Sequence, residues 1–528
     1  MLIYRLVSSL CLLSLPLSAG QHFTTTLKEI TDSYTIGSQN AKFIQDKLTQ
    51  QLPEDGYAIQ LKKIYESIGS LVPNPCIQGG IWLNENGKVL YRIEKGPLYL
   101  LDIESGKATE IVGHQKGSQY PYRLNNLDEV LYFKQTERGK WNVLVRGEKE
   151  RTLLDLTKFN RLKDDSGPEY EEFLSAFNKK KDIRVEFNDL GHVLFAYGNS
   201  VTKTWFFTPE RATSNLDNGN SSLDWILSSA PFSILGMTTQ GDIFIKTIAV
   251  PEDMILYKAK DKSKIYFASE HGGINRFITN KRGSVVIPTP FPTFVSRDER
   301  DAHGKRIMRR AIGRDHLLKE GSKEVFPPHK FFAQDMNATD QVIGFGITGK
   351  CDYDLGCTYD KAFIKAMKWD ITTGLAVVET LGGRRSAALG VNTQGAIVGW
   401  AETPEGLIHA FLKMEETTVD IGAELPSESL ALDINDEGWV LGIGKDAQGL
   451  FQTFLYHREK GLVNVAQQLQ GQYPHSFSIP IGFNQKGQVV GVIFYPGENG
   501  TLRFPFTYNP ANGNSAPLPH YSASEAGL

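Results

Sequence analysis

The side chains best suited to chemistry gather in one polar segment, KCDYDLGCTYD, at residues 350–360. Cys351 and Cys357 are close enough in sequence for a local disulfide, whose loop closure would contribute about 2 kcal/mol. Asp352, Asp354 and Asp360 offer carboxylates of the kind that calcium binds. The segment lacks the glycine and the final glutamate of an EF-hand loop, and no second Cys or His pair supports zinc. The disulfide is therefore the main prediction, and calcium is the weaker alternative.

A second candidate is the charged segment Ser296–His316, which contains Arg306, Arg309, Arg310 and Arg314. Clustered guanidinium groups would suit an anion or a polysaccharide. The segment also holds several acids, and mixed charge runs are typical of a solvated loop. Both interpretations stay open at this point.

No sequence pattern identifies catalytic residues, which therefore stay unknown. The chain has no Gly-x-Ser-x-Gly elbow, no His-Glu-x-x-His and no phosphate-binding loop, and its 11 His are scattered. No cofactor is predicted apart from the weak calcium candidate. The formal net charge of −3 argues against a general nucleic-acid binder.

The first residues predict export. Arg5 precedes the short apolar run Leu6–Leu17, and the small residues Ser18–Gly20 favour cleavage near residue 20. A membrane anchor is the alternative, but the run is short for a bilayer and contains Pro16. Residues 1–20 are thus a predicted signal peptide, and the mature protein would be periplasmic or extracellular without a transmembrane segment. Cys76 is then the unpaired thiol.

Most of the chain repeats one pattern, in which apolar residues lead into Asn-x-x-Gly and a second apolar run follows. Asn at the first position of a type I turn can accept bonds from the backbone, and Gly at the fourth tolerates positive φ. The pattern occurs nine times, at intervals of about 41 to about 63 residues. Six copies keep both residues: Asn84 and Gly87, Asn188 and Gly191, Asn280 and Gly283, Asn392 and Gly395, Asn435 and Gly438, and Asn484 and Gly487. Asp128 and Asp340 replace Gly after Asn125 and Asn337, and Thr238 replaces Asn before Gly241.

A third and a fourth apolar segment follow many of these hairpins, as in HAFLKM from His409 and TTVDIG from Thr417. Four short strands per repeat are typical of a β-propeller blade. We therefore predict an all-β, propeller-like array of about nine four-stranded repeats, in one large or two smaller rings. A series of β-sandwiches is the competing architecture.

The C-terminal copies resemble the extracellular repeats named HAF for their His-Ala-Phe triplet. The matching residues are Leu381–Gly383, Ser386 and Ala388, the Asn392 hairpin with Gly399, and His409–Leu412. The resemblance is strong over about 331–510 and weak over 80–320, and it implies export and a repeated β fold but no reaction. The triplet is assigned as Lys361–Phe363 in an earlier copy and Gln452–Phe454 in a later one. Phe363, Phe411, Phe454 and Phe506 would then form an inter-blade stripe.

The predicted organisation is a signal peptide (1–20), a helical N-terminal segment (21–75), divergent β repeats (80–325), HAF-type β repeats (331–513) and a polar tail (514–528). The predicted function is a non-enzymatic binding or interaction scaffold with an unknown protein or polysaccharide ligand. The alternative is a propeller-type hydrolase or lyase acting on a polysaccharide or another polymer, since propeller enzymes can gather acids and bases from several blades.

Overall fold

The computed structural model describes residues 80–93, 96–113, 122–135, 141–155, 183–197, 203–207, 232–247, 253–257, 264–268, 277–282, 284–287, 293–295, 330–347, 351–352, 356–357, 364–370, 372–497 and 500–519. These residues belong to two compact units, with the boundary in the sequence between Thr279 and Asn280. We call them the N-terminal unit and the C-terminal unit. Within the described ranges, no helix has the length and apolar character needed to cross a membrane.

The N-terminal unit consists of antiparallel sheets whose strands follow one another in sequence order. The first sheet contains β1 (Trp82–Leu83), β2 (Lys88–Arg92), β3 (Leu98–Asp102) and β4 (Ala108–Val112). The second contains β5 (Tyr122–Leu124), β6 (Val130–Gln135), β7 (Trp141–Arg146) and β8 (Glu150–Asp155). The third has three described strands, β9 (Ile183–Phe187), β10 (Val193–Tyr197) and β11 (Lys203–Phe207). The fourth contains β12 (Phe232–Met237), β13 (Ile243–Thr247), β14 (Asp253–Tyr257) and β15 (Lys264–Ala268).

The last described strand of the N-terminal unit is β16 (Ile278–Thr279), and the first strands of the C-terminal unit are β17 (Val285–Ile287) and β18 (Thr293–Val295). The next sheet contains β19 (Lys330–Met336), β20 (Val342–Ile347), β23 (Ile364–Asp370) and β24 (Gly374–Val377). Between β20 and β23 lies a two-stranded ribbon of β21 (Cys351–Asp352) and β22 (Gly356–Cys357).

Three complete four-stranded sheets follow in the C-terminal unit. They contain β25 (Ser386–Val391), β26 (Ile397–Glu402), β27 (Ile408–Met414) and β28 (Thr417–Asp420); β29 (Ser429–Ile434), β30 (Val440–Lys445), β31 (Phe451–His457) and β32 (Gly461–Asn464); and β33 (Phe477–Phe483), β34 (Val489–Gly497), β35 (Gly500–Asn509) and β36 (Asn514–Pro517). The short helices η6 (Gly422–Glu424) and α7 (Gln467–Gln472) lie in the connections between them.

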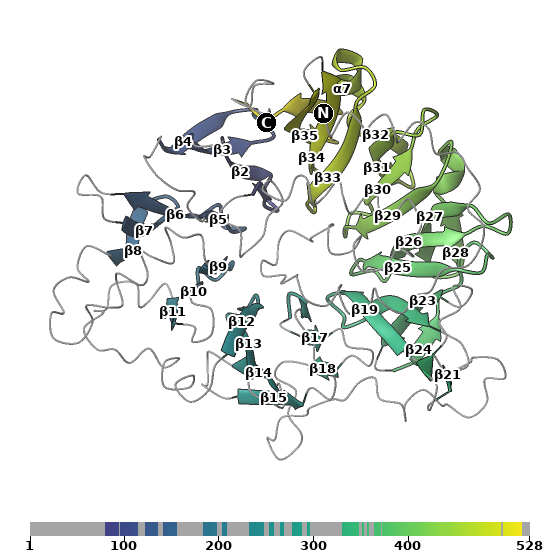
Figure 1. Ribbon diagram of the computed structural model, residues 1–528, viewed down its shortest axis with the longest axis horizontal. Helices are drawn as coiled ribbons and strands as arrows, with labels where there is room; N and C mark the ends of the chain where they lie inside the picture. The colour runs from purple at the N-terminus through teal and green to yellow at the C-terminus, as the bar shows by residue number, and fades with distance from the viewer. Residues whose placement is uncertain are drawn as a thin grey trace. The chain divides into compact units, whose positions relative to one another are not determined.

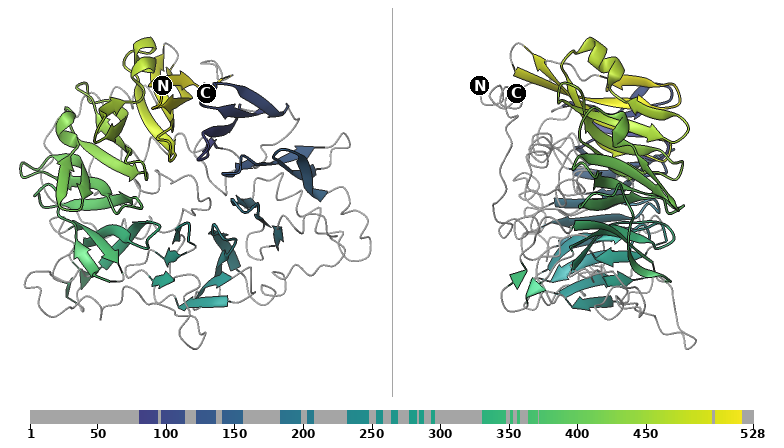
Figure 2. Two further views of the ribbon diagram at one scale, coloured as in Figure 1. Left: turned by 180° about the vertical axis from the view of Figure 1, so that it is seen from behind. Right: turned by 90° about the vertical axis from the view of Figure 1, so that its right-hand side faces the viewer.

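Successive sheets within a unit pack face to face (Figures 1 and 2). Val398, Ala410 and Leu412 of one sheet are buried against Ala431 and Ile434 of the next. The first two sheets of the N-terminal unit share a core in the same way, with Trp82 and Leu90 against Tyr122 and Tyr132. One such sheet has too little apolar surface to be stable alone, so each repeat depends on its neighbours.

A repeated irregularity brings the first and second strands of each C-terminal sheet unusually close together. The first strand has a register shift at Ala333/Asp335, Ala388/Gly390, Ala431/Asp433 and Pro480/Gly482. The residue seven positions after the turn Asn is glycine in all four sheets: Gly344, Gly399, Gly442 and Gly491. A Cβ on Gly344 would lie 1.9 Å from the Phe332 oxygen, and one on Gly399 would lie 2.0 Å from the Ala387 oxygen. Glycine is therefore required there because the strands approach too closely for any side chain.

The all-β, propeller-type arrangement predicted from the sequence is confirmed. Seven sheets have all four strands, and the predicted repeats at Asn188 and Asn280 have three described strands each. The number of blades in a ring stays a prediction. The predicted signal peptide and helical segment, residues 1–75, lie outside the described residues.

One predicted boundary is wrong. Residues 514–517 were assigned to a polar tail, but β36 pairs with β35 as the fourth strand of the last sheet. The segment Asn514–Pro517 carries little apolar side-chain area, so only backbone pairing identifies it as a strand.

Candidate functional site

The repeated turns have one geometry. In the turn at Asn435, the Gly438 N–H donates to the Asn435 carbonyl at 3.1 Å, and the Asn435 N–H donates to the Trp439 carbonyl at 3.0 Å. This is a hairpin in which a type I turn is followed by one residue in the left-handed region. That residue has positive φ in each described copy: Gly87, Asp128, Gly191, Gly241, Asp340, Gly395, Gly438 and Gly487. Gly283 lies outside the described residues.

The side-chain oxygen of the turn Asn holds its own turn together. Asn84 Oδ1 accepts from the backbone N–H groups of Asn86 at 3.1 Å and Lys88 at 2.8 Å. The same pair of bonds forms at Asn125, Asn188 and Asn280. Thr238 Oγ1 makes the equivalent bonds to Gln240 and Asp242, at 3.3 and 3.0 Å. The local role of this residue therefore needs only an oxygen acceptor.

The side-chain nitrogen of the turn Asn has a different role, because it donates to the backbone carbonyl of the equivalent residue in the next repeat. We call this series of bonds the asparagine ladder. In the N-terminal unit it links Asn84 to Asn125 (2.9 Å), Asn125 to Asn188 (3.2 Å) and Asn188 to Thr238 (3.3 Å). In the C-terminal unit it links Asn280 to Asn337 (2.9 Å), Asn337 to Asn392 (2.9 Å), Asn392 to Asn435 (3.1 Å) and Asn435 to Asn484 (3.1 Å). These amides are buried, so the bonds fix neighbouring repeats at the turns.

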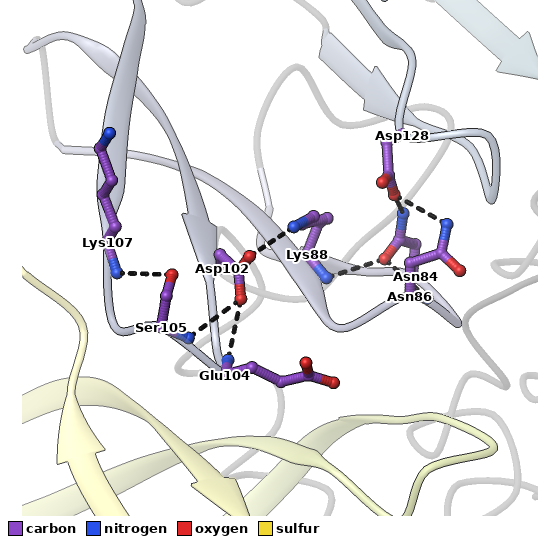
Figure 3. A network of polar contacts seen from close by, with 8 residues as sticks. All are labelled: Asn84, Asn86, Lys88, Asp102, Glu104, Ser105, Lys107 and Asp128. Atoms are coloured by element: carbon purple, nitrogen blue, oxygen red, sulfur yellow. Dashed lines mark hydrogen bonds and ion pairs between the residues drawn. The ribbon is translucent and has the colours of Figure 1, made fainter.

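Figure 3 shows other polar contacts around Asn84, the first asparagine of the ladder. Asn84 and Asn86 both donate through Nδ2 to Asp128 Oδ1, at 2.7 and 3.0 Å. Beside them, Lys88 Nζ pairs with Asp102 Oδ2 at 2.5 Å, and Asp102 Oδ1 accepts from the Glu104 N–H at 2.9 Å. Burial raises the pKa of Asp102, but the Lys88 hydrogen bond and backbone N–H donors outweigh it, so the pKa lies below its usual 3.8.

A second contact joins repeats at the other end of the sheets. At that end, a loop joins the second strand to the third, and another loop leads from the fourth strand to the next sheet. We call this the connection end and the opposite one the turn end. Three serines at the start of a first strand accept from a third-strand N–H of the preceding sheet: Ser386 from Ala366 (3.0 Å), Ser429 from Ala410 (3.0 Å) and Ser478 from Thr453 (2.9 Å).

These serine bonds show which residues occupy the equivalent triplet positions. The residue after each donor pairs with the glycine of the second strand: Met367 with Gly344, Phe411 with Gly399, and Phe454 with Gly442. The triplet of the earlier copy is therefore Lys365–Met367 and not Lys361–Phe363. Met367 replaces Phe363 in the predicted stripe. The sequence pattern favours the wrong register because Lys-Ala occurs in both triplets, at Lys361 and at Lys365, and only the first is followed by Phe.

The first position of the triplet carries a different side chain in each C-terminal sheet, with different partners. Lys365 Nζ donates to the Gly383 carbonyl at 3.0 Å. His409 Nδ1 lies 3.0 Å from both carboxylate oxygens of Asp420. Gln452 Nε2 donates to Asp446 Oδ2 at 2.8 Å. The equivalent residue of the last sheet is Phe504, which is buried.

Charged groups lie close together beside the Lys365 position. Arg385 forms an ion pair with Glu402, and the Arg385 N–H donates to Glu402 Oε2 at 2.9 Å. Burial lowers the pKa of Lys365, and the Glu402 carboxylate opposes this effect. Gly383 is required beside them, since a Cβ there would lie 2.3 Å from the Glu402 carbonyl oxygen.

The other sequence-predicted site residues are only partly described. The backbone of Cys351 pairs directly opposite that of Cys357 in the β21–β22 ribbon, and the disulfide itself stays a prediction. Asp352 lies in the same ribbon, whereas Asp354 and Asp360 lie outside the described residues. The same holds for Arg306, Arg309, Arg310 and Arg314. Among the residues that are described, no group of three or more His, Cys, Asp and Glu could hold a metal ion.

Comparison with known proteins adds similarity of fold only. No protein-family model matches the sequence, and no curated protein matches it. Similar solved structures include the β-propeller domain of the Trilobed protease from Pyrococcus furiosus, at 10% identity over 84% of this chain and 96% of that chain, with a TM-score of 0.32. A eukaryotic initiation factor matches at 11% identity over 73% of this chain and 86% of that chain, with a TM-score of 0.38. TolB from Acinetobacter baumannii matches at 10% identity over 68% of both chains, with a TM-score of 0.24.

Proposed function

We propose that the protein is an exported binding scaffold whose recognition surface is the connection end of its sheets. The observation that carries this proposal is the difference between the two ends. At the turn end, equivalent positions hold the same residue types and make the same buried bonds in successive repeats. At the connection end, the first triplet position changes from Lys365 to His409, Gln452 and Phe504 on an otherwise equivalent frame.

A rigid, repeated frame that carries varied side chains at one end is the arrangement that many binding proteins use. Exposed polar and apolar residues accompany the variable positions at that end. Arg384, Glu405 and Leu407 are exposed in the connections around β25–β27, and Leu407 has an exposed fraction of 54%. We propose an extracellular or periplasmic location on the basis of the predicted signal peptide, and a protein or polysaccharide as the ligand.

Binding to insoluble polysaccharides and to immobilised peptides, measured by co-sedimentation, tests this proposal. The triple substitution Arg384→Ala, Glu405→Ala and Gln472→Ala changes the connection end. The substitution Glu437→Ala together with Lys486→Ala changes the turn end and serves as the matched control. We expect the connection-end variant to lose at least tenfold in affinity and the turn-end variant to bind like the wild type. The reverse result would contradict the proposal.

The alternative is a hydrolase or lyase acting on a polymer. The same polysaccharide incubations can be assayed for soluble sugar with new reducing ends. Release that is proportional to protein concentration and time would favour the enzyme. Stable binding with intact polymer would favour the scaffold.

A further inference from the structure

We infer that the loop Tyr473–Ser476, between α7 and β33, is a binding site for a neutral oligosaccharide. This inference rests on the proposed function, because the loop lies at the connection end of the last sheet. It names a ligand class for that surface.

The loop is held from several directions at once. The Tyr473 N–H donates to the Leu469 carbonyl at 2.8 Å, and the Ser476 N–H donates to the Tyr473 carbonyl at 3.3 Å. From below, the amides of Gln452 and Gln470 both donate to the Ser476 carbonyl, at 3.4 and 3.2 Å. Gln470 also donates to Gln452 Oε1 and accepts from Asn464 at 2.9 Å. The loop is thus fixed by the buried Gln452 amide of the preceding sheet and the half-buried Gln470 amide of α7.

His475 has an unusual backbone conformation within this fixed loop. Its φ is +61°, in the left-handed region, and its side chain is exposed. A non-glycine residue in this region costs on the order of 1 kcal/mol and persists where the surroundings determine the conformation. Strained residues of this kind are concentrated at ligand-binding sites, so the conformation of His475 supports a binding role for the loop.

Aromatic rings form one side of the site. The Tyr473 ring lies 5.4 Å from the Tyr495 ring, edge to face, and 4.8 Å from the buried Phe504 ring. Tyr473 and Tyr495 are each half-buried, so part of both rings stays accessible. Phe477 and Phe494 stack at 4.4 Å with their planes 5° apart on the opposite face of the sheet, because side chains alternate along β34. The Phe504 ring at the variable triplet position therefore packs against Tyr473.

Two buried hydroxyl groups close to the loop lack a protein partner. Ser476 Oγ and Thr453 Oγ1 make no hydrogen bond, and the two residues are 2% and 0% exposed. Thr453 is the residue whose N–H bonds Ser478, two positions after Ser476. A buried hydroxyl without a partner costs about 1–3 kcal/mol, so such groups commonly bind an ordered water or a ligand atom.

The charge pattern around the loop selects the ligand class. The sequence has 22% charged residues, yet the 25 residues 461–485 contain no Asp, Glu, Lys or Arg. The exposed polar groups there are the amides of Gln467, Gln468 and Gln472 and the His475 ring. The nearest carboxylate bonded to this network, Asp446, already accepts from Gln452, Gln448 and Leu450. A charged ligand would find no counter-ion among these side chains.

Aromatic rings beside neutral amides suit a pyranose sugar. The C–H face of the sugar can lie on a tyrosine ring, and its hydroxyls can both donate to and accept from an amide. A fixed loop also lowers the entropy cost of binding, because its side chains are ordered before the ligand arrives. A proline-rich peptide also binds tyrosine pairs, and it is the alternative that the experiment must separate.

Isothermal titration calorimetry on the full chain tests the inference with cellohexaose, maltohexaose, laminarihexaose and mannohexaose. A heparin hexasaccharide and a proline-rich dodecapeptide serve as competing probes. We expect at least one neutral hexasaccharide to bind. Tyr495→Ala and Gln472→Ala should each weaken its binding at least tenfold. Gln394→Ala, an exposed glutamine at the turn end of the same unit, should leave it unchanged, and circular dichroism checks that each variant is folded.

Three results would overturn the inference: no neutral hexasaccharide binds, binding is unchanged in both Tyr495→Ala and Gln472→Ala, or only the peptide or heparin binds. In the third case, if binding is lost in the connection-end triple variant and kept in the turn-end variant, the proposed function stands without the sugar. If the turn-end variant loses it instead, the proposed function fails as well.

Discussion

At the scale of single residues, the turn asparagine combines two functions in one side chain. Its oxygen closes the turn and its nitrogen bonds the next repeat, as the Asn392 and Asn435 contacts show. Threonine can replace the first function only, and Thr238 demonstrates this. The two functions can therefore be separated by substitution.

Asn392→Thr should keep the turn and lose the ladder bond to the Asn435 carbonyl. We expect a loss of about 1 kcal/mol, the usual contribution of one buried hydrogen bond. Asn392→Ala should lose more, about 2 kcal/mol, because the turn acceptor also disappears. Urea unfolding of both variants measures the difference. Equal losses would show that the ladder bond contributes nothing to stability.

The turn glycines differ in the space around them. At Gly438 an added Cβ would lie 3.6 Å from the His457 ring, which is an ordinary contact. At Gly487 it would lie 2.8 Å from the Trp439 ring, so the neighbouring repeat leaves no room. The left-handed conformation is common to both, with φ of +83° and +75°.

Gly438→Asn should therefore cost only a few tenths of a kcal/mol, since Asn tolerates this conformation, whereas Gly438→Val should cost about 1–2 kcal/mol or more. Gly487→Asn should cost more than Gly438→Asn because the Trp439 ring must move. Thermal unfolding of the three variants checks this order. If Asn and Val were equally harmful at Gly438, the turn assignment would be wrong.

Asp102 provides a prediction for pH. Because its pKa is lowered in the folded protein, the carboxylate stabilises the fold above the unfolded pKa of about 4. This stabilisation is lost as the pH falls through the folded value. Asp102→Asn should be less stable than the wild type at pH 7, and the difference should shrink below about pH 4. Urea unfolding midpoints between pH 7 and pH 2.5 measure the stability difference between the wild type and Asp102→Asn, with Glu104→Gln as the control. A difference that does not depend on pH would refute the prediction.

At the scale of elements, three successive junctions of the C-terminal unit are fastened at both ends. The ladder acts at the turn end and the serine bond acts at the connection end, with the apolar core between them. Ser429 is fully buried, and its Oγ is the acceptor for the Ala410 N–H.

Ser429→Ala should cost about 1–3 kcal/mol, because a buried N–H loses its acceptor. Ser427→Ala, two residues earlier and only half-buried, should change stability by less than about 0.5 kcal/mol. Hydrogen exchange adds a local measurement, since the Ala410 amide should exchange faster in the first variant alone. Unchanged protection of Ala410 would contradict the assigned role.

The β21–β22 ribbon raises the redox prediction. Directly opposed backbones suit a cross-strand Cys351–Cys357 bond, and an exported protein would meet oxidising conditions. Mass mapping of the non-reduced secreted protein should show a peptide crosslinked within itself. Two thiols that can be alkylated there would refute the prediction.

At the scale of the whole molecule, the sequence predicted the repeats well because their main signal is local. Asn435 and Gly438 need particular backbone conformations, and those needs appear as residue types at fixed spacing. Each ladder bond joins an asparagine amide to a carbonyl 41 to 63 residues away, in the next repeat. No local pattern encodes that contact, so the ladder was missed although its residues were identified.

The connection end was predicted less well for a related reason. The triplet register depends on which residue faces Ser386, and only the three-dimensional pairing decides between Lys361 and Lys365. The loop at Tyr473 was not identified at all. Its one signal in the sequence was the absence of charge over residues 461–485, which has no characteristic spacing.

Because each sheet depends on its neighbours for stability, removal of the last sheet should destabilise the sheet before it. A chain ending at Gln472 would lack the last sheet, which packs on β30 and β31. The register of these strands places three fully buried side chains on the face toward the last sheet: Leu441, Ile443 and Leu455. They would become exposed to solvent. We expect the shortened chain to bind the dye ANS and to associate, as a repeat array without its end does. A monomeric chain that does not bind the dye would show that the remaining sheets are self-sufficient.

The asparagine ladder also has a direction. From the Asn337 repeat to the Asn435 repeat, each repeat offers a carbonyl oxygen to the repeat before it and an amide to the repeat after it, so these junctions are made from the same two groups. A segment cut between two equivalent turns carries both groups with it and can be inserted at another junction of the same kind. The ladder bonds at the turns can therefore be kept when the number of repeats changes by whole units, so gain or loss of a unit during gene duplication needs no accompanying substitution of the turn asparagines.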